Sequence, residues 1–559
     1  MQRLSAGTHP GDVLKALRGT RLPHANLSEQ TAAKAILPGV HSDGELELLV
    51  RHPKAYCALD LPVVAQDTVS NLFLGGASSQ AYTSQLEQVQ STKQPSNHPK
   101  YCDTRLEELK IDFWTSVPLK NEDAASAISL YLETHHPIWC FFDASQFLND
   151  LIECKTDAES TCSPLMVSAL LAFALQGYSS VNTAIAKYSY QFEEQAEKLF
   201  AAEGETDSLP TIAALALLYT TIATHGDVPR AIKYLTAARE AADRMDLFGR
   251  PNSATYDSPK SEAAASQAAW GLFNFLVQMV QFQVVQPLEH PPVMSLPEES
   301  RINEGFKSSG KQDTVSTSPA LAEMQQARLV FCRLWTIVNE VFLIYRDNKI
   351  RARSLAFAIG KYRKLLDLID TLPEPMTRQD KTPHWVLIFH TSAHMVVLDL
   401  FRPYIAEDEQ HGFRAYVAEG LLFMFAIEYA PAYWNLALSG AMVFTVNAVL
   451  NDLSDQERKN YLYFCISMSQ RLLPSYVYMI ETIRAILAIA TDKGAITKAE
   501  AIRIEVDSTS LQRDRRTDRS RGGWTVAPTV NDNKSGAIDT LADRFEMITL
   551  FDEFTEGIA

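Results

Sequence analysis

The sequence predicts an all-α fold, because apolar residues recur at helical spacing over most of the chain, between residue types that begin and end helices. These signals are dense from about Leu106, and no strand pattern competes with them over a comparable length. With 46% hydrophobic and 21% charged residues, the composition is that of a globular chain with ample apolar surface for a large core. We therefore expect a large multi-helix domain over residues 106–492.

The segment SPLMVSALLAFALQG carries the clearest helix signals. Ser163 is an N-cap residue, Pro164 follows at the first helical position, and Gly177 closes the segment. Its interior is apolar on nearly every side, which predicts a central place in the core.

Two further helices are predicted between Ser208 and Met245. The first begins after Ser208 and ends at Gly226, and the second follows Asp227 and Pro229. The second places one apolar stripe opposite a charged face. Such a hairpin is also typical of a tetratricopeptide unit, but no second copy recurs at a period of about 34 residues. A repeat adaptor therefore remains an alternative of lower rank.

The later part of the domain repeats these patterns. Residues 268–285 read as a deeply apolar helix, residues 295–318 as an exposed loop, and helices resume at Glu323 and again around Leu355. The run from Tyr429 to Asn451 has 23 residues without a charge, enough to cross a bilayer. Its several polar residues favour a buried core helix instead, so no contact with a membrane is expected.

The two ends of the chain have different compositions from the middle. Residues 1–105 are rich in turn-forming and polar runs and predict a flexible, linker-like segment. Residues 493–540 predict a polar basic linker, in which Arg513 to Arg521 form a basic run interrupted by aspartates. That run is either a nuclear-import or phosphate-contacting patch or, as we favour, a solvated charge run.

Residues 541–559 form an acidic and hydrophobic tail. This mixture is typical of activation segments that fold on a coactivator, and it fits equally well a C-terminal amphipathic helix docked on its own core. The apolar residues that would carry activation are Phe545, Leu550, Phe551 and Phe554.

Charge and cysteine usage exclude several classes of protein. A net charge of −16 disfavours direct binding of nucleic acid or an anionic membrane by this chain alone. The seven cysteines include no pair at CxxC spacing, so they predict neither a zinc site nor a disulfide framework. No secretory signal is evident at the start, which indicates a reducing compartment, cytosolic or nuclear.

No motif for catalysis occurs in the sequence. It contains no phosphate-binding glycine loop, no GxSxG and no HExxH. His390 and His394 share one helical face but have no third ligand at a suitable spacing, and His135-His136-Pro137 reads as a helix end. We expect no enzyme activity, no metal site and no bound cofactor.

Several segments, in order, resemble the middle homology region of fungal binuclear zinc-cluster transcription regulators. They are RLEELKIDFWTSVPL, the HHPIWCFFDASQFLNDLI passage, CSPLMVSALLAFALQGYS, QFEEQAEKLF, DSLPTIAALALLYTTIATHG, YLTAAREAADRMDLFG, WGLFNF and FHTSAHMVVLDLFRPY. Each is weak alone, but their order from about Leu106 to Tyr404 is typical of the family. The positions that match the family's motifs include His136, Pro137, Phe141, Phe142, Asp143, Ser163, Pro164, Trp270, Arg402 and Pro403.

The resemblance implies an all-helical regulatory domain that controls transcription by RNA polymerase II in the nucleus, and it allows shuttling with the cytoplasm. It implies coactivators or other regulators as partners, and it allows a small-molecule effector and a homodimer. The family's six-cysteine DNA-binding cluster has no counterpart in this sequence. Zinc and DNA are therefore expected only through a cluster that a longer form would carry, or through a partner. A helical scaffold without a transcriptional role is the alternative from another class.

Overall fold

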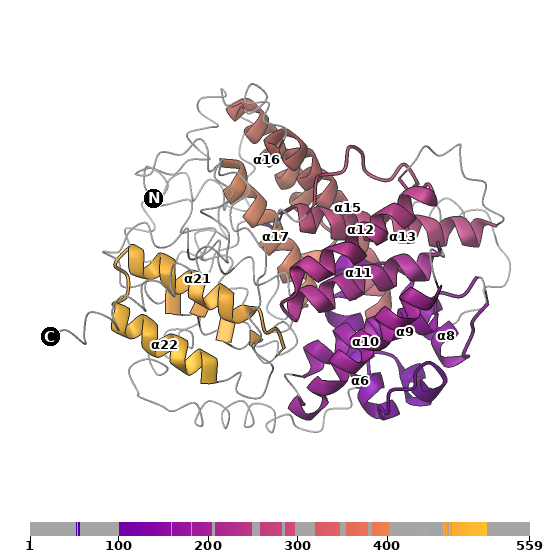
Figure 1. Cartoon of the computed structure of the whole chain (residues 1–559). Helices are drawn as coiled ribbons and strands as arrows, with labels where there is room; N and C mark the ends of the chain where they lie inside the picture. Colours follow the sequence, from indigo (N-terminus) through magenta and orange to yellow (C-terminus); the bar gives the residue numbers. More distant parts are fainter. Residues whose placement is uncertain are drawn as a thin grey trace, which may run out of the picture.

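In the computed structural model, every regular element among the described residues is a helix, as the sequence predicts (Figure 1). The structure describes residues 100–157, 159–179, 182–203, 207–248, 258–281, 285–296, 319–346, 354–377, 383–401 and 475–510. It also describes His52, Lys54, Ala55, Asn435, Met442, Val446, Leu462, Tyr463, Cys465, Ile466, Ser469, Gln470, Leu472 and Leu473.

The first part of the body is a stack of helices around α9 (Pro164–Tyr178). Two short 3-10 turns, η1 (Thr104–Glu108) and η2 (Ile111–Phe113), lead into α6 (Asn121–Thr134), α7 (His136–Trp139) and α8 (Ala144–Ile152). After α9 come η3 (Thr183–Ile185), α10 (Ala186–Glu203), α11 (Leu209–Thr224) and α12 (Val228–Arg244). Helix α9 packs against α6, α10 and α11, which explains why it is apolar all round.

The second part extends this stack (Figure 1). Helix α13 (Pro259–Gln281) packs on α11 and on α15 (Pro319–Arg346), and α15 in turn contacts α7, α16 (Leu355–Asp370) and α17 (His384–Phe401). A short 3-10 turn, η5 (Glu374–Met376), lies between α16 and α17 in the sequence. The last described helices, α21 (Met479–Asp492) and α22 (Lys498–Ser510), lie side by side.

Three helix starts follow the capping chemistry expected from the sequence. The hydroxyl of Ser163 accepts from the backbone N–H of Met166, and that of Ser208 accepts from Thr211. Asp227 caps α12 in the same way. Gly177 differs from the expectation: it lies inside α9, which continues to Tyr178, because Ser179 caps the end instead.

The packed body extends past both expected domain boundaries. Tyr101, Cys102 and Asp103 are buried ahead of residue 106, and the Cys102 N–H donates to the hydroxyl of Ser129 at 2.8 Å. Beyond residue 492, α22 packs on α21, with Ala501 buried and an ion pair between Arg484 and Glu505 at 2.8 Å. Residues 498–510 are therefore a packed helix at the start of the segment predicted to be a linker, since one face of this polar helix is apolar.

Parts of the chain far apart in sequence meet in one core. The side-chain amide of Asn435 donates to the carbonyl of Thr134 at 3.0 Å, and the Ser475 hydroxyl donates to the carbonyl of Gly177 at 3.0 Å. Asn435, Met442 and Val446, the described residues of the long uncharged run, are all buried. Within the described residues, no helix is long and apolar enough to span a membrane.

Candidate functional site

The family-motif residues His136 and Pro137 begin a tight turn at the centre of the body. Helix α7 has only four residues and ends at Cys140, whose φ of 51° lies in the left-handed region. His136, Pro137, Phe141 and Phe142 are all buried. The turn therefore directs a set of aromatic side chains into the core.

Helix α13 crosses this turn so closely that only glycine fits at Gly271. A Cβ atom at this position would lie 2.7 Å from the carbonyl oxygen of Cys140 and 2.8 Å from the Cα of Phe141. The Gln267 amide donates to the carbonyls of Cys140 at 2.8 Å and Phe142 at 3.2 Å. The HHPIWCFFD and WGLFNF motifs thus form one joint, which we call the α7–α13 joint.

Two tryptophans fix the flanks of the α7–α13 joint. The indole N–H of Trp139 donates to Oε1 of Gln278 at 3.1 Å. That of Trp270 donates to the carbonyl of Met294 at 3.0 Å. Both indoles are buried with their polar atom satisfied, as buried tryptophans require.

His136 is neutral at physiological pH. Burial lowers its pKa to about 4; the nearby Asp143 opposes this shift and the nearby Arg328 adds to it. Its ring lies 4.6 Å from that of Phe142 and 6.0 Å from that of Tyr131, measured between centroids. The side chain acts as a packing group in this aromatic cluster.

The carboxylates that follow the turn organise the next loop. Asp143 caps α8 by accepting from the N–H of Gln146 at 2.9 Å. Asp150 is buried and accepts from both the N–H and the hydroxyl of Thr161, at 2.9 and 2.8 Å. This second contact holds the loop just before the Ser163 and Pro164 start of α9.

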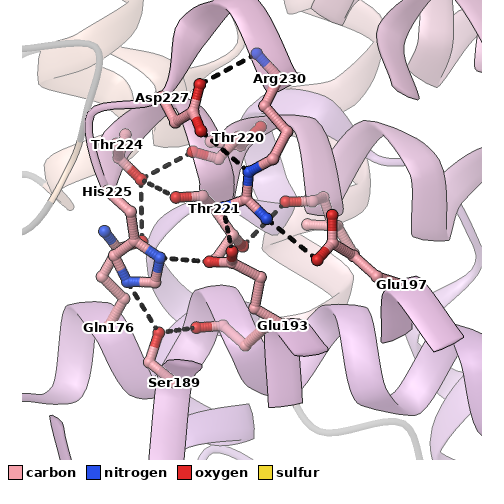
Figure 2. A network of polar contacts seen from close by, with 12 residues as sticks. Gln176, Ser189, Glu193, Glu197, Thr220, Thr221, Thr224, His225, Asp227 and Arg230 are labelled. Atoms are coloured by element: carbon pink, nitrogen blue, oxygen red, sulfur yellow. Dashed lines mark hydrogen bonds and ion pairs between the residues drawn. The ribbon is translucent and has the colours of Figure 1, made fainter. Parts of the chain in front are cut away.

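A partly buried cluster of charged side chains lies among α10, α11 and α12 (Figure 2). Glu193 of α10 lies 2.5 Å from Nδ1 of His225 and 2.5 Å from a guanidinium nitrogen of Arg230. Arg230 also contacts Glu197 at 2.9 Å and Asp227 at 3.0 Å. We call these five side chains the Glu193 network, and each charged group in it meets a partner of opposite or complementary character.

Hydroxyl and aromatic groups contact the network at His225. The Ser189 hydroxyl donates to the carbonyl of Ala172 at 2.7 Å and lies 3.2 Å from Nε2 of His225. The ring of Tyr190 stacks on that of His225 with centroids 3.9 Å apart. In Figure 2, Gln176 and Thr224 lie beside this imidazole, with Thr224 Oγ1 2.9 Å from Gln176 Oε1.

The electrostatics of the network favour the charged form of Glu193. Burial alone would raise the pKa of Glu193, but hydrogen bonds and charges from His225 and Arg230 outweigh it and lower the pKa. Burial and a hydrogen bond from its hydroxyl to Glu197 raise the pKa of Tyr234. The network therefore ties three helices together through satisfied charges, and its donors and acceptors are engaged with one another.

Of the two adjacent glutamates in the QFEEQAEKLF segment, only Glu193 is buried. Glu194 is exposed and pairs with Lys198 one turn away. Glu193 follows Ser189 by four residues and precedes Ala196 by three, and all three are buried. This helical spacing was the available signal, because it places Glu193 on the apolar face.

His390 and His394, the histidine pair that shares one helical face, are buried in α17, and Nε2 of His390 lies 3.3 Å from the carbonyl of Met376. The other predicted residues lie outside the described part of the chain: Arg402, Pro403, Phe545, Leu550, Phe551 and Phe554.

The described residues contain no group of three or more His, Cys, Asp or Glu side chains that could hold a metal ion. Burial raises the pKa of the thiols of Cys162 and Cys465, so both stay protonated. No disulfide links the described cysteines. The buried Cys162 and Cys465 thus serve as small apolar residues.

These features describe an all-helical protein in which the described family-motif residues cap helices or pack helices against one another. Two fungal transcription regulators are similar to it in sequence. The "Notoamide biosynthesis transcriptional activator notL'" of Aspergillus versicolor is 26% identical over 297 residues, which cover 51% of this chain and 46% of that protein. The "Nitrogen assimilation transcription factor nit-4" of Neurospora crassa is 24% identical over 366 residues, which cover 60% of this chain and 32% of that protein.

The resemblance to fungal transcription regulators that the motifs predict is thereby confirmed. The matched region spans less than half of the length of either relative. No protein-family model matches the chain, and no solved structure matches it.

Proposed function

We propose that this chain is the regulatory region of a fungal transcription regulator that acts in the nucleus and has no enzyme activity. The observation that carries the proposal is the similarity to a transcriptional activator over 297 residues. The α7–α13 joint supports it, because two motifs that mark the resemblance pack against each other there.

Output is proposed to pass through coactivators that bind the acidic and hydrophobic tail, residues 541–559. Acidic residues keep such a segment accessible to solvent, while a few aromatic side chains supply the apolar area that a coactivator groove buries. Contact with DNA is proposed to come from a zinc cluster in a longer form of the protein or from a partner.

A reporter assay tests the proposal. The full chain, fused to a heterologous DNA-binding domain, should activate a reporter in fungal cells. Changing Phe551 and Phe554 to alanine should abolish this activation, because those rings supply the apolar contact. Phe113→Ala is the matched control, since Phe113 is 54% exposed on η2 and lies outside the tail.

Two results would contradict the proposal. A fusion that is expressed at normal level but silent would remove the transcriptional role. Equal loss of activation in Phe113→Ala would show that the response does not depend on the tail. A loss of thermal stability on removing residues 541–559, with a silent fusion, would favour a tail docked on its own core.

A further inference from the structure

A cavity lies between α15 and the C-terminal end of α16. Its volume is about 270 Å³, close to the lower end of the range of about 300–1,000 Å³ that is typical of small-molecule pockets. The apolar walls are Leu329, Val330, Leu368, Leu372 and Pro373. Leu368 and Leu372 are buried, so the walls are held by the core.

One cation, Arg333, also lines this cavity, and its side chain is exposed. Among the described residues it has no hydrogen bond or ion pair, and two carboxylates of α15 and α16 are engaged with other partners. Asp370 lies 2.7 Å from Nδ1 of His52. Glu340 pairs with Lys361 and Lys364. The guanidinium is therefore available to a carboxylate from outside, which it can bind through two parallel hydrogen bonds.

The polar rim of the cavity also includes Thr371, which is exposed. Its hydroxyl donates to the carbonyl of Asp367 at 2.8 Å, so the oxygen remains able to accept a hydrogen bond. Apolar walls with a few polar groups at the rim are the usual arrangement of a small-molecule site.

The same end of α16 anchors a segment from the N-terminal part of the chain. The ammonium of Lys54 donates to the carbonyls of Asp370 at 3.0 Å and Leu372 at 2.8 Å, and so caps the helix end. Leu372 contributes to both features, because its side chain lines the cavity and its carbonyl holds Lys54. An occupant of the cavity would thus stabilise the anchor of the N-terminal segment.

Helix α15 connects the cavity to the α7–α13 joint. Arg328, next to the cavity residue Leu329, is buried and close enough to His136 to contribute to lowering its pKa. Helix α15 also packs directly on α7. A compound bound against Leu329 and Arg333 therefore touches the helix that supports the joint.

We propose that this cavity binds a small organic acid, with its carboxylate on Arg333 and its apolar body between α15 and α16. The role of such an acid as an effector rests on the proposed regulatory function, whereas its binding does not. A metabolite with one carboxylate and a short aromatic or aliphatic body has the chemistry that the cavity matches.

Titration calorimetry on the full chain tests the site, with 4-phenylbutyrate as the probe and neutral 4-phenylbutanamide for comparison. Arg333→Gln should weaken the binding of 4-phenylbutyrate about 10-fold or more, as expected for the loss of a charged hydrogen bond. The same change should leave the affinity for 4-phenylbutanamide unchanged. Arg363→Gln is the matched control, because Arg363 is exposed on α16 but does not line the cavity. Thr371→Trp, a change at the exposed rim, should weaken both probes by filling the cavity.

The proposal is overturned if 4-phenylbutyrate shows no saturable binding at millimolar concentration, or if Arg333→Gln and Arg363→Gln weaken it equally. Thermal denaturation of each variant identifies any loss of folding, and Arg333 and Thr371 are both exposed, so intact folding is expected. Because the assay measures binding to purified protein, its failure leaves the reporter result unaffected, and a silent reporter leaves the binding result standing.

Discussion

Gly271 lies where two backbones come into contact, and its lack of a side chain permits that contact. Cys140 takes up a left-handed conformation on the other side, so the turn cannot easily move away. Inserting an atom into a well-packed core typically costs about 1–3 kcal/mol. The glycine of the WGLF sequence is therefore required for the close packing of α13 on the turn at the end of α7.

We expect Gly271→Ala to lower the free energy of unfolding by about 2 kcal/mol or more, because the new methyl group meets backbone atoms and not a flexible side-chain end. Chemical denaturation measures the effect. Gly360→Ala is the control, since it is exposed in α16 with nothing within 4 Å of the added Cβ. That change should stabilise the helix by about 0.5–1 kcal/mol. Equal effects of the two changes would contradict the close approach.

Glu193 shows how one buried charge is made compatible with the core. Its carboxylate accepts from two cationic or ring nitrogen groups on two other helices. Removing one member of such a cluster leaves the others with unsatisfied hydrogen-bonding capacity. The contribution of the Glu193–Arg230 ion pair to stability is reduced because Arg230 is 36% exposed and partly solvated.

Glu193→Gln should lower the free energy of unfolding at pH 7 by about 2 kcal/mol. The pKa of Glu193 is lowered in the folded state, so its contribution is fully present above the unfolded pKa of about 4.3 and is lost as pH falls through the folded pKa. The difference between wild type and variant should therefore shrink below about pH 4. Denaturation from neutral to acid pH measures this trend.

Glu194→Gln is the matched control for the Glu193 change, because Glu194 pairs with Lys198 at the exposed surface. Glu194→Gln should change the free energy of unfolding by less than about 0.5 kcal/mol. A pH-independent difference between wild type and Glu193→Gln would exclude the charged network as its cause.

At the scale of elements, the helix starts share one chemistry. An N-cap side chain, Ser163, Ser208 or Asp227, is followed by proline in the first turn. The cap satisfies a backbone N–H that the helix itself leaves without a partner, and proline loses nothing there because its missing N–H is not needed. Since this chemistry is local, the sequence predicts these starts well.

Ser163→Ala should lower the free energy of unfolding by about 1 kcal/mol, because the N–H of Met166 loses its acceptor at the start of the central helix. Ser126→Ala is the control. Ser126 lies inside α6 and bonds only the carbonyl of Glu122 one turn back, so alanine should be neutral or slightly stabilising there. Thermal and urea denaturation compare the two, and an equal loss in both would contradict the capping role.

Other elements were less predictable because tertiary contacts decide them. Gly177 looks like a helix end, but it remains helical because α9 is packed on several sides and the Ser475 hydroxyl donates a hydrogen bond to its carbonyl. Helix α22 has a polar sequence, yet Ala501 and Ser508 are buried against its neighbour. Local composition carries no information on these partners.

At the scale of the whole molecule, one hydrophobic core includes residues from Ala55 to Ile504. The sequence predicts the helical class and the apolar faces, since both depend on periodicity within each segment. Three features depend instead on which helices meet in the fold: the Glu193 network, the α7–α13 joint and the cavity. At the joint, for example, Gln267 and Cys140 are in contact although more than 100 residues separate them in the sequence. Periodicity alone does not specify those pairings.

The charge of the whole chain leads to a prediction about DNA. A net charge of −16 opposes the approach of phosphates, and binding gains affinity mainly when cations on the protein release counterions. We expect no tight binding of duplex DNA by the purified chain at about 0.15 M salt. A mobility-shift assay across salt concentrations measures this.

Any weak retention at low salt should come from the basic run Arg513 to Arg521 and should disappear when Arg515 and Arg516 are changed to glutamine. Changing Arg239 and Arg244 to glutamine is the control, because both arginines are on α12 and already pair with carboxylates there or nearby. Sequence-selective binding at nanomolar concentration would show that the chain itself reads DNA. The proposed role would then include target recognition, and contact through a partner or a separate zinc cluster would no longer be required.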